Sequence, residues 1–480
     1  MMKRRTILKA AAVAGMATFA GVVPGLRALA ASALRVRRCV NDMKLDDPDL
    51  ETYRDFVGLM LAKPQANPVS WLGFANQHGN AKAYKFCPHG DWYFLPWHRE
   101  YTLMYERAAS VLTKNPGFAL PYWDWTALRD YPAAFASATY KGKPNPLYVK
   151  GRNALTGKNA LTDAIVGPAV MQEIYRETVY EAFGTSRNPK QRDLDPSWVV
   201  RGGGYQGRLE STPHNLVHNS IGAFMPGPNS PRDPIFFMHH GNIDRIWAMW
   251  NRLGRANSKD PLWLGMAFKD NYLTPDGKPY SRGVKDLLDT APLGYTYDTV
   301  QAQGGAVLQA ASPRHTRNMS ALFDPAQPAR PPRIRKENAA AAKPGAPLSV
   351  PFDLKQGGPL SSQPGEPEAR EVVALIGDIR LGDAVKEIRV FVNLPSASEE
   401  TPESDPHFVA RIAFLRHPPG HEDHKSLPSA QVNLTEALRR IPQQGTGDAI
   451  SIQLLPVRYA GADKAAAADV VPATVEVAIL

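Results

Sequence analysis

The sequence predicts two domains of different class: a mainly α-helical domain over residues 31–305 and a β-sandwich domain over residues 351–480. Two observations support this division. Apolar residues recur at helical spacing in the first region, whereas apolar and polar residues alternate in the second. A chain of 480 residues also exceeds the usual size of one domain.

The first thirty residues are typical of an export signal. MMKRRTILKA is basic, and the apolar run AAVAGMATFAGVVPGL that follows is too short to span a membrane. Arg4 and Arg5 resemble a twin-arginine signal, which exports folded proteins, and a general secretory signal is the alternative. We expect residues 1–30 to be removed, leaving a periplasmic or secreted protein with no stable membrane anchor.

Charge and cysteine content exclude two classes of protein. Half of the formal charge of +10 comes from the five basic residues of the signal. The charge that remains does not indicate a nucleic-acid-binding surface. The chain has two cysteines, Cys39 and Cys87, so a disulfide framework does not hold it together. Cys87 therefore needs another explanation.

Within the helical domain, residues 50–62 and 99–112 show the apolar spacing of amphipathic helices. Residues 306–350 are rich in Pro, Ala and basic residues without periodicity, which is typical of a linker and of a protease target. Beyond this segment the period becomes two. Three clear examples are residues 388–392, 450–454 and 475–479, which predict strands of a β-sandwich.

Seven of the twelve histidines fall into two groups. The first group is His78, His89 and His98, and the second is His214, His218, His239 and His240. A lone histidine is more often a core residue than a ligand, but two such groups in one domain are not explained that way. All-imidazole ligation suits copper or zinc, and a single-zinc hydrolytic site would use only one group. Two copper ions account for both.

Four motifs resemble those of the type-3 copper proteins, which are the tyrosinases, catechol oxidases and molluscan-type haemocyanins. They are PHGDWYFLPWHREY, LPYWDW, PHNLVH and DPIFFMHHGNIDRIW, within residues 37–297. The resemblance implies a four-helix bundle around two copper ions. It also implies that one ion is held by His78, His89 and His98, and the other by His214, His218 and His240.

The choice between His239 and His240 also has a physical argument. Phe236 and Asp244 stand four residues either side of His240, so on one helix they would flank its ring. We therefore expect His240 to be the ligand and the ring of His239 to point elsewhere.

The resemblance also explains Cys87. In fungal-type and molluscan members of the family, a cysteine two residues before the second histidine is bonded through sulfur to that ring. Cys87 and His89 have this spacing. The alternative is a small buried thiol.

The implied reaction is oxidation of o-diphenols to o-quinones with reduction of dioxygen to water, together with o-hydroxylation of monophenols. Glu210 and Asn215 match the glutamate and asparagine that orient a water in family members with monophenolase activity. Helix-terminal roles are compatible alternatives for both residues. The alternatives for the whole protein are a reversible oxygen carrier of haemocyanin type and a catechol oxidase without monophenolase activity. Met225, Pro226 and Gly227 remain equal candidates for the residue that overhangs the second copper.

Two weaker resemblances concern the domain end and the C-terminal domain. LGYTYD resembles the Tyr-x-Tyr stretch of the plant enzymes, whose tyrosines contact an arginine near the start, here Arg37. The C-terminal sequence resembles the β-domain that lies over the copper site of plant polyphenol oxidases and keeps these enzymes latent. An added interaction module is the alternative. Cleavage at residues 331–344 is expected to release this latency.

Overall fold

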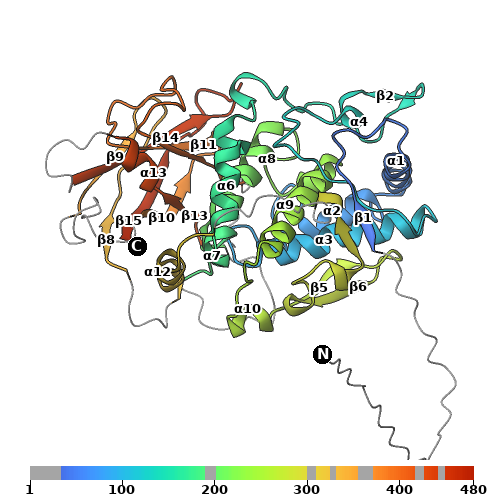
Figure 1. The fold of residues 1–480 in the computed structure, drawn as a ribbon. Coiled ribbons are helices and arrows are strands. Elements are labelled where there is room, and N and C mark those ends of the chain that lie inside the picture. Colours follow the sequence, from blue (N-terminus) through green and yellow to red (C-terminus); the bar gives the residue numbers. More distant parts are fainter. Residues whose placement is uncertain are drawn as a thin grey trace, which may run out of the picture.

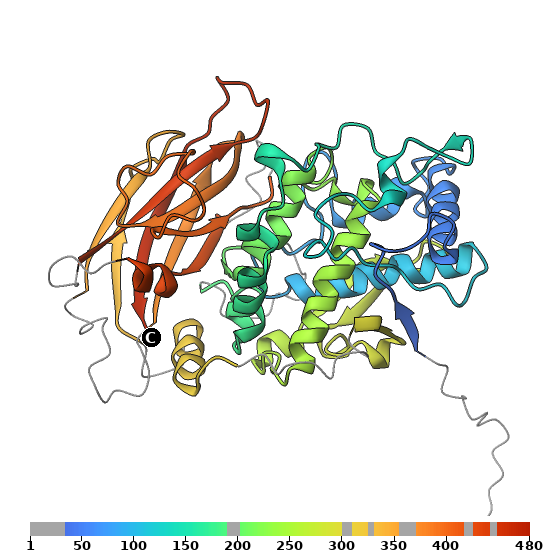
Figure 2. The same cartoon turned by 45° about the horizontal axis from the view of Figure 1, so that its top comes forward.

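The computed structural model describes residues 34–189, 202–299, 310–324, 331–354, 371–416, 426–441 and 449–480. The expected export signal lies outside the described residues. Figure 1 shows a helical region beside a strand-rich C-terminal region, and Figure 2 shows the same two parts from another side. In the described part of the chain, no helix combines the length and apolar character that a membrane crossing requires.

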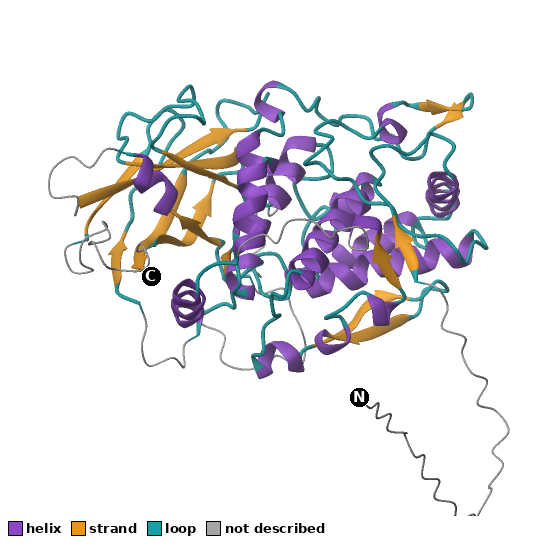
Figure 3. Cartoon of the chain, in the orientation of Figure 1, coloured by secondary structure: helices purple, strands orange, loops and turns teal. Residues whose placement is uncertain are grey.

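Helices dominate residues 34–299 (Figure 3). These helices are α1 (Pro48–Leu61), α2 (Trp71–His78), α3 (Phe94–Leu112), α4 (Ala133–Ala136), α5 (Asp163–Val166), α6 (Pro168–Arg176), α7 (Tyr180–Phe183), the π-helical turn Glu210–His214, α8 (Asn215–Ile221), α9 (Ile235–Arg252) and α10 (Pro261–Gly265). Short 3₁₀ turns lie at Gly157–Asn159, Ser230–Arg232, Val284–Asp286 and Ala291–Leu293. The short strands are β1 (Arg35–Arg37), β2 (Thr139–Tyr140), β3 (Lys143–Pro144), β4 (Tyr205–Gln206), β5 (Ala267–Leu273), β6 (Pro279–Gly283) and β7 (Tyr295–Tyr297). The two helices expected over residues 50–62 and 99–112 are confirmed as α1 and α3.

Local sequence signals explain where the first helices begin. The side chain of Asp47 caps α1 by accepting from the N–H of Asp49, and Pro48 occupies the first turn, where its missing N–H costs nothing. The Ser70 hydroxyl accepts from the N–H of Gly73 and starts α2. The Ser70 cap fixes where α2 begins, and therefore helps to place its last residue, His78.

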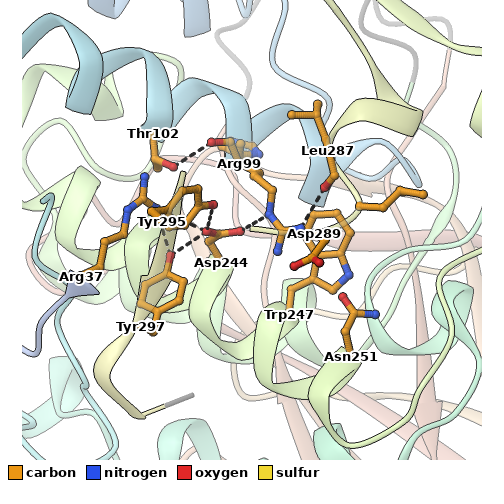
Figure 4. Close-up of polar contacts among 12 residues, drawn as sticks. Arg37, Arg99, Thr102, Asp244, Trp247, Asn251, Leu287, Asp289, Tyr295 and Tyr297 are labelled. Carbon is orange, nitrogen blue, oxygen red and sulfur yellow. Dashed lines mark hydrogen bonds and ion pairs between the residues drawn. The ribbon is translucent and has the colours of Figure 1, made fainter. Parts of the chain in front are cut away.

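A buried polar network closes the helical region (Figure 4). β1 pairs in parallel with β7 and brings Arg37 to the two tyrosines of β7. Arg37 Nη1 donates to the Tyr297 hydroxyl at 3.0 Å, and its guanidinium lies 3.7 Å from the centre of the Tyr295 ring. Both tyrosine hydroxyls donate to Asp244 at 2.6 Å, and Arg99 Nε donates to the same carboxylate at 2.5 Å. The predicted contact between Arg37 and the tyrosines is confirmed.

The C-terminal region is built from two sheets. The strands are β8 (Arg333–Glu337), β9 (Leu348–Asp353), β10 (Val372–Leu381), β11 (Val385–Val392), β12 (Phe408–Ile412), β13 (Ser429–Asn433), β14 (Ala449–Arg458) and β15 (Val470–Ile479), with one helix, α13 (Thr435–Arg440). The five-stranded sheet has the order β4-β13-β10-β15-β8, and the four-stranded sheet has the order β12-β11-β14-β9. Ile376 and Val477 of the first sheet and Val390 and Leu454 of the second are fully buried in one apolar core. The strand-rich C-terminal region is confirmed.

One strand of the larger sheet comes from the helical region. β4 pairs in parallel with β13, with Ser429 opposite Tyr205 and Ala430 opposite Gln206. The two regions are therefore joined by a continuous sheet as well as by side-chain contacts.

The segment expected to be a linker contains regular structure, so that interpretation is wrong for its described part. Residues Pro313–Phe323 form α12, whose N-terminus is capped by the Ser312 hydroxyl. Residues Arg333–Glu337 form β8, which pairs with β15 at the edge of the five-stranded sheet. An edge strand tolerates basic, exposed side chains, so its composition resembled that of a linker.

α12 also holds the two regions together through an ion triad. His315 Nε2 lies 3.0 Å from Glu177, which follows α6, and His315 Nδ1 lies 2.8 Å from Glu371, which precedes β10. Burial alone would lower the pKa of His315, but the hydrogen bonds to both glutamates raise it to about 10. The ring is therefore charged at neutral pH and attracts a carboxylate from each region.

Candidate metal centre

The structure brings all six predicted ligand histidines into two buried groups. The first group comprises His78, Cys87, His89 and His98, and the second comprises His214, His218, His239 and His240. Within each group the candidate ligand atoms lie within 4.8 Å of one another. They come from the end of α2, the loop before α3, α3 itself, the π-helical turn, α8 and α9.

Four of these rings are oriented through Nδ1. The contacts are His78 Nδ1 to Pro228 O (2.9 Å), His98 Nδ1 to Phe94 O (2.8 Å), His214 Nδ1 to Asn215 Oδ1 (2.8 Å) and His218 Nδ1 to Met225 O (2.7 Å). Each oxygen can only accept, so each Nδ1 carries the hydrogen and each Nε2 keeps its lone pair. Anchoring of one nitrogen by a carbonyl or amide oxygen is the usual way in which a protein presents the other nitrogen to a metal.

The rings are also neutral, as ligands must be. Burial lowers the pKa of His78 to about 3 and that of His218 to about 4. Burial, together with neighbouring histidines, places the pKa values of His98, His214 and His240 well below their ordinary value. His78 Nε2 and His214 Nε2 are buried without a protein partner. Buried, unpaired imidazole lone pairs in two groups fit two metal ions of the copper or zinc type.

His239 lies within the second group, so the prediction that its ring points elsewhere is wrong. Its ring centre is 4.8 Å from that of His218 and 5.2 Å from that of His240. However, the Trp125 indole N–H donates to His239 Nδ1 at 3.2 Å. An indole nitrogen only donates, so His239 carries its own hydrogen on Nε2 and offers no lone pair there. His240 therefore remains the better third donor.

The neighbours of His240 are partly those expected. The Phe236 ring lies 4.0 Å from the His240 ring, and the His98 ring stacks on it at 4.3 Å with an interplanar angle of 13°. Asp244 does not flank the ring as predicted, because its carboxylate is bound in the network of Arg37 and Arg99 in Figure 4. The four-residue spacing from His240 correctly placed Asp244 on the same face of the helix. It could not show that two arginines from other parts of the chain bind the Asp244 carboxylate.

Cys87 faces both His89 and His98. Its Sγ lies 3.3 Å from His89 Nδ1 and 3.6 Å from His89 Nε2, so it is nearly equidistant from the two nitrogens that flank ring carbon Cε1. The same sulfur lies 3.2 Å from His98 Nε2. Burial raises the pKa of the thiol well above its ordinary value.

Glu210 is fully buried beside the loop that carries His89. Its Oε1 accepts from the N–H of Gly90 at 2.8 Å, and its other oxygen accepts from the Thr185 hydroxyl. Gly90 has a φ of +64°, a left-handed conformation that suits glycine. Burial raises the pKa of Glu210 to about 8.

Asn215 uses its whole amide group within the protein. Its Oδ1 accepts from His214, while its two amide hydrogens go to Gln206 Oε1 at 2.9 Å and to Ala413 O at 2.7 Å. Ala413 belongs to the C-terminal region, so this side chain joins a candidate ligand to the other region of the chain. Sequence reasoning missed both Gln206 and Ala413, because neither lies in a motif.

The loop between α8 and α9 supplies two of the ring anchors. Met225 is buried and orients His218 through its carbonyl, whereas Pro228 orients His78. A Cβ on Gly79 would meet Pro228 Cβ at 2.7 Å, so the glycine after α2 permits this close approach. The role of this loop in orienting both groups is a feature that its sequence alone did not reveal.

Comparison with known proteins agrees with the site. Residues 68–253 match the common central domain of tyrosinase, and residues 350–470 match the C-terminal domain of chloroplastic polyphenol oxidase. A tyrosinase from Hahella sp. (strain CCB-MM4) is 29% identical over 310 residues, which cover 54% of this chain and 62% of the relative. Chloroplastic polyphenol oxidase A1 from Vicia faba is 33% identical over 311 residues, which cover 56% of this chain and 48% of the relative. The matches thus span about half to three-fifths of these two relatives.

The whole fold also has a solved counterpart. The structure of latent apple tyrosinase matches 94% of this chain and 98% of that chain with a TM-score of 0.63 at 23% identity. This likeness establishes a helical core followed by a C-terminal sheet domain. Residues 68–253 of this chain thus belong to the central-domain family of the tyrosinases, and residues 350–470 carry a C-terminal domain of the chloroplastic polyphenol oxidase type.

Proposed function

We propose that this protein is a phenol oxidase with two copper ions. It oxidises o-diphenols to o-quinones while dioxygen is reduced to water, and it also hydroxylates monophenols. The observation that carries the proposal is the convergence of two buried groups of imidazoles, four of which are neutral and anchored through Nδ1. The ligands would be His78, His89 and His98 for one ion and His214, His218 and His240 for the other.

Copper, when bound, supplies the two-electron redox chemistry, while the chain supplies geometry and a water-poor setting. The carbonyls of Pro228 and Met225 hold the rings of His78 and His218 in fixed orientations. Phe236 and the stacked ring of His98 hold His240. This pre-organisation lowers the cost of bringing six side chains to two ions.

We propose that the Cys87 sulfur is bonded to His89 Cε1 in the active protein. The bond replaces the S–H bond of Cys87 and the Cε1–H bond of His89, and dioxygen takes the two protons and two electrons. The position of the sulfur between the two nitrogens of His89 supports this bond. The crosslink would fix the one candidate ligand of the first group that is carried by a loop.

Glu210 and Asn215 are proposed to orient the water that serves monophenol hydroxylation. Both side chains lie near Gly90. Glu210 accepts a hydrogen bond from the Gly90 N–H, and Gln206, which accepts from the Asn215 amide, packs beside Gly90. When the C-terminal region is docked on the helical region, the Ala413 carbonyl accepts one of the two amide hydrogens of Asn215. Departure of Ala413 would therefore leave Asn215 free to donate to a water.

Latency is proposed as the role of the C-terminal region, which includes β8 and β9 as well as the residues after 350. Leu415 supports this role, because it is only 4% exposed and packs into the apolar core of the helical region. The carbonyl of the next residue, Arg416, accepts from the Tyr84 hydroxyl, and the Tyr84 ring lies 5.1 Å from that of His89. The region is held by α12 and its ion triad, so cleavage in residues 331–344 acts by freeing β8 rather than by cutting a loose tether.

Export through a twin-arginine signal in residues 1–30 is proposed from the sequence. The mass of the mature protein recovered from the periplasm or medium tests it, because removal of the signal leaves a new N-terminus near residue 31. A full-length mass in the cytoplasm alone would refute export.

The alternatives are a reversible oxygen carrier and a catechol oxidase without monophenolase activity. Copper content, measured together with oxygen uptake on a monophenol and on its diphenol, separates all three. Two copper ions per chain with uptake on both substrates supports the proposal. Uptake on the diphenol alone favours the catechol oxidase, and reversible oxygen binding without turnover favours the carrier.

A further inference from the structure

A short segment of the C-terminal region follows the helical turns that carry His214 and His218. This segment, residues 411–416, begins in β12 and continues beyond it. It bonds to four residues spaced along one helix face, namely Ser211, Thr212, Asn215 and Asn219. The bonds are Ala413 N to Ser211 O (2.8 Å), Thr212 Oγ1 to Arg411 O (2.9 Å), Asn215 Nδ2 to Ala413 O (2.7 Å) and Asn219 Nδ2 to Phe414 O (3.2 Å).

The helix at this point needs outside support. Residues Glu210–His214 form a π-helical turn with Pro213 inside it, so the backbone lacks one N–H and its hydrogen bonding departs from the regular ladder. Ser211 O and the Thr212 hydroxyl both find partners in the C-terminal segment. The turn that ends at His214 is therefore completed by hydrogen bonds from the other region.

The same segment reaches the anchors of three candidate ligands. Ala413 holds the amide of Asn215, whose oxygen orients the His214 ring. Arg416 N donates to Pro226 O at 2.6 Å. Pro226 lies in the loop between the two carbonyls that orient His218 and His78.

We propose that residues 411–416 are part of the scaffold that sets the metal-binding geometry, so that the C-terminal region retains the metal as well as covering the site. The inference rests on the proposed function for the identity of the metal, but it concerns retention rather than turnover. Loss of these contacts would let the rings of His214 and His218 drift from their fixed orientations. Metal affinity depends on such outer contacts by about 10- to 100-fold.

Asn219 allows this to be tested without touching a ligand or its anchor. Its amide donates to Phe414 O and, at 2.8 Å, to Lys386 O, and both acceptors lie in the C-terminal region. Gln431 provides a matched control, because its amide also donates across the interface to two backbone carbonyls, those of Glu181 and Ala182. Asn219→Ala and Gln431→Ala thus each remove two bonds between the regions, the first beside the site and the second away from it.

The experiment measures copper release from the intact, copper-loaded chain into excess chelator, with the melting temperature of each variant recorded alongside. We expect Asn219→Ala to release copper about tenfold faster than the wild type, and Gln431→Ala to stay within about twofold of it. Thr212→Val, which loses only the bond to Arg411 O, is a milder variant that is expected to give a smaller acceleration in the same direction.

Three outcomes would overturn the inference: wild-type release from Asn219→Ala and Thr212→Val, equal acceleration in Asn219→Ala and Gln431→Ala, or no copper bound by the wild type. The last outcome would remove the proposed function as well. Copper that is bound and then lost faster from Asn219→Ala, in a chain that oxidises no phenol, would refute the proposed function and leave this inference standing.

Discussion

Truncation of Leu415 should open the site of the uncut chain. This side chain belongs to the C-terminal region but is 4% exposed within the core of the helical region, so Leu415→Ala removes apolar contacts made only when the two regions are docked. Burial of a leucine of this kind is worth about 2–5 kcal/mol. A loss of about 3 kcal/mol from docking would raise the undocked fraction by roughly 150-fold, since 1.4 kcal/mol corresponds to a factor of ten.

The assay is the initial rate of oxygen uptake with a bulky catechol, measured on copper-loaded, uncut protein. We expect the rate of Leu415→Ala, expressed per copper ion bound, to rise towards that of protease-treated protein. Leu434→Ala is the control, because Leu434 is fully buried within the C-terminal region's own core and its loss lowers stability without removing a contact to the helical region. A wild-type rate in Leu415→Ala, or an equal rise in both variants, would refute this reasoning.

Four further expectations concern single residues. His240→Ala should lose one copper ion and all oxidation, while His239→Ala should keep copper, and metal analysis showing the reverse would transfer the ligand role to His239. Cys87→Ser should load copper more slowly but still bind it, and peptide mass spectrometry of the loaded wild type should show the Cys87 segment lighter by two hydrogens; an alkylatable Cys87 in active protein contradicts the crosslink. Glu210→Gln should reduce monophenol hydroxylation more than diphenol oxidation, and equal losses in the two oxygen-uptake assays would count against its water-orienting role. The pKa of His315 is raised from its ordinary value near 6.5 to about 10, so the ion triad stabilises the fold fully below pH 6.5 and loses this effect as pH rises through about 10. His315→Gln should therefore lower the melting temperature at pH 8 but hardly at pH 11. An equal decrease at both pH values would exclude the ion triad as the cause.

The sequence located the candidate site well because its signals are local. The spacing of His214 and His218 on one helix face, and the motifs around His89 and His98, do not depend on the rest of the chain. The strands at residues 388–392 and 475–479 were visible for the same reason, since alternation of apolar and polar residues is a local signal of a strand. The sequence did not reveal that both faces of these segments are buried.

Features that depend on distant partners were beyond sequence reasoning. The carboxylate of Asp244 forms ion pairs with Arg37 and Arg99, and the spacing of residues within α9 could not indicate these partners. β8 looked like a linker because an edge strand exposes its basic residues. The contacts of Ala413 with the helix that carries His214 arise only when two regions, far apart in sequence, pack together.

The position of β15 has a consequence for biosynthesis. β15 is the last strand in chain order, yet it lies between β10 and β8, so the five-stranded sheet cannot close until residues 470–479 have been made. Translation of the roughly 170 residues between the helical region and this strand takes about 10–35 s, during which the earlier domain can fold alone. Throughout that interval the histidines have been synthesised, but the segment 411–416 has no completed sheet to hold it in place. If the histidine groups bind metal as proposed, the metal would enter this uncovered site first and would be retained once the final strand has been made and the second region has docked.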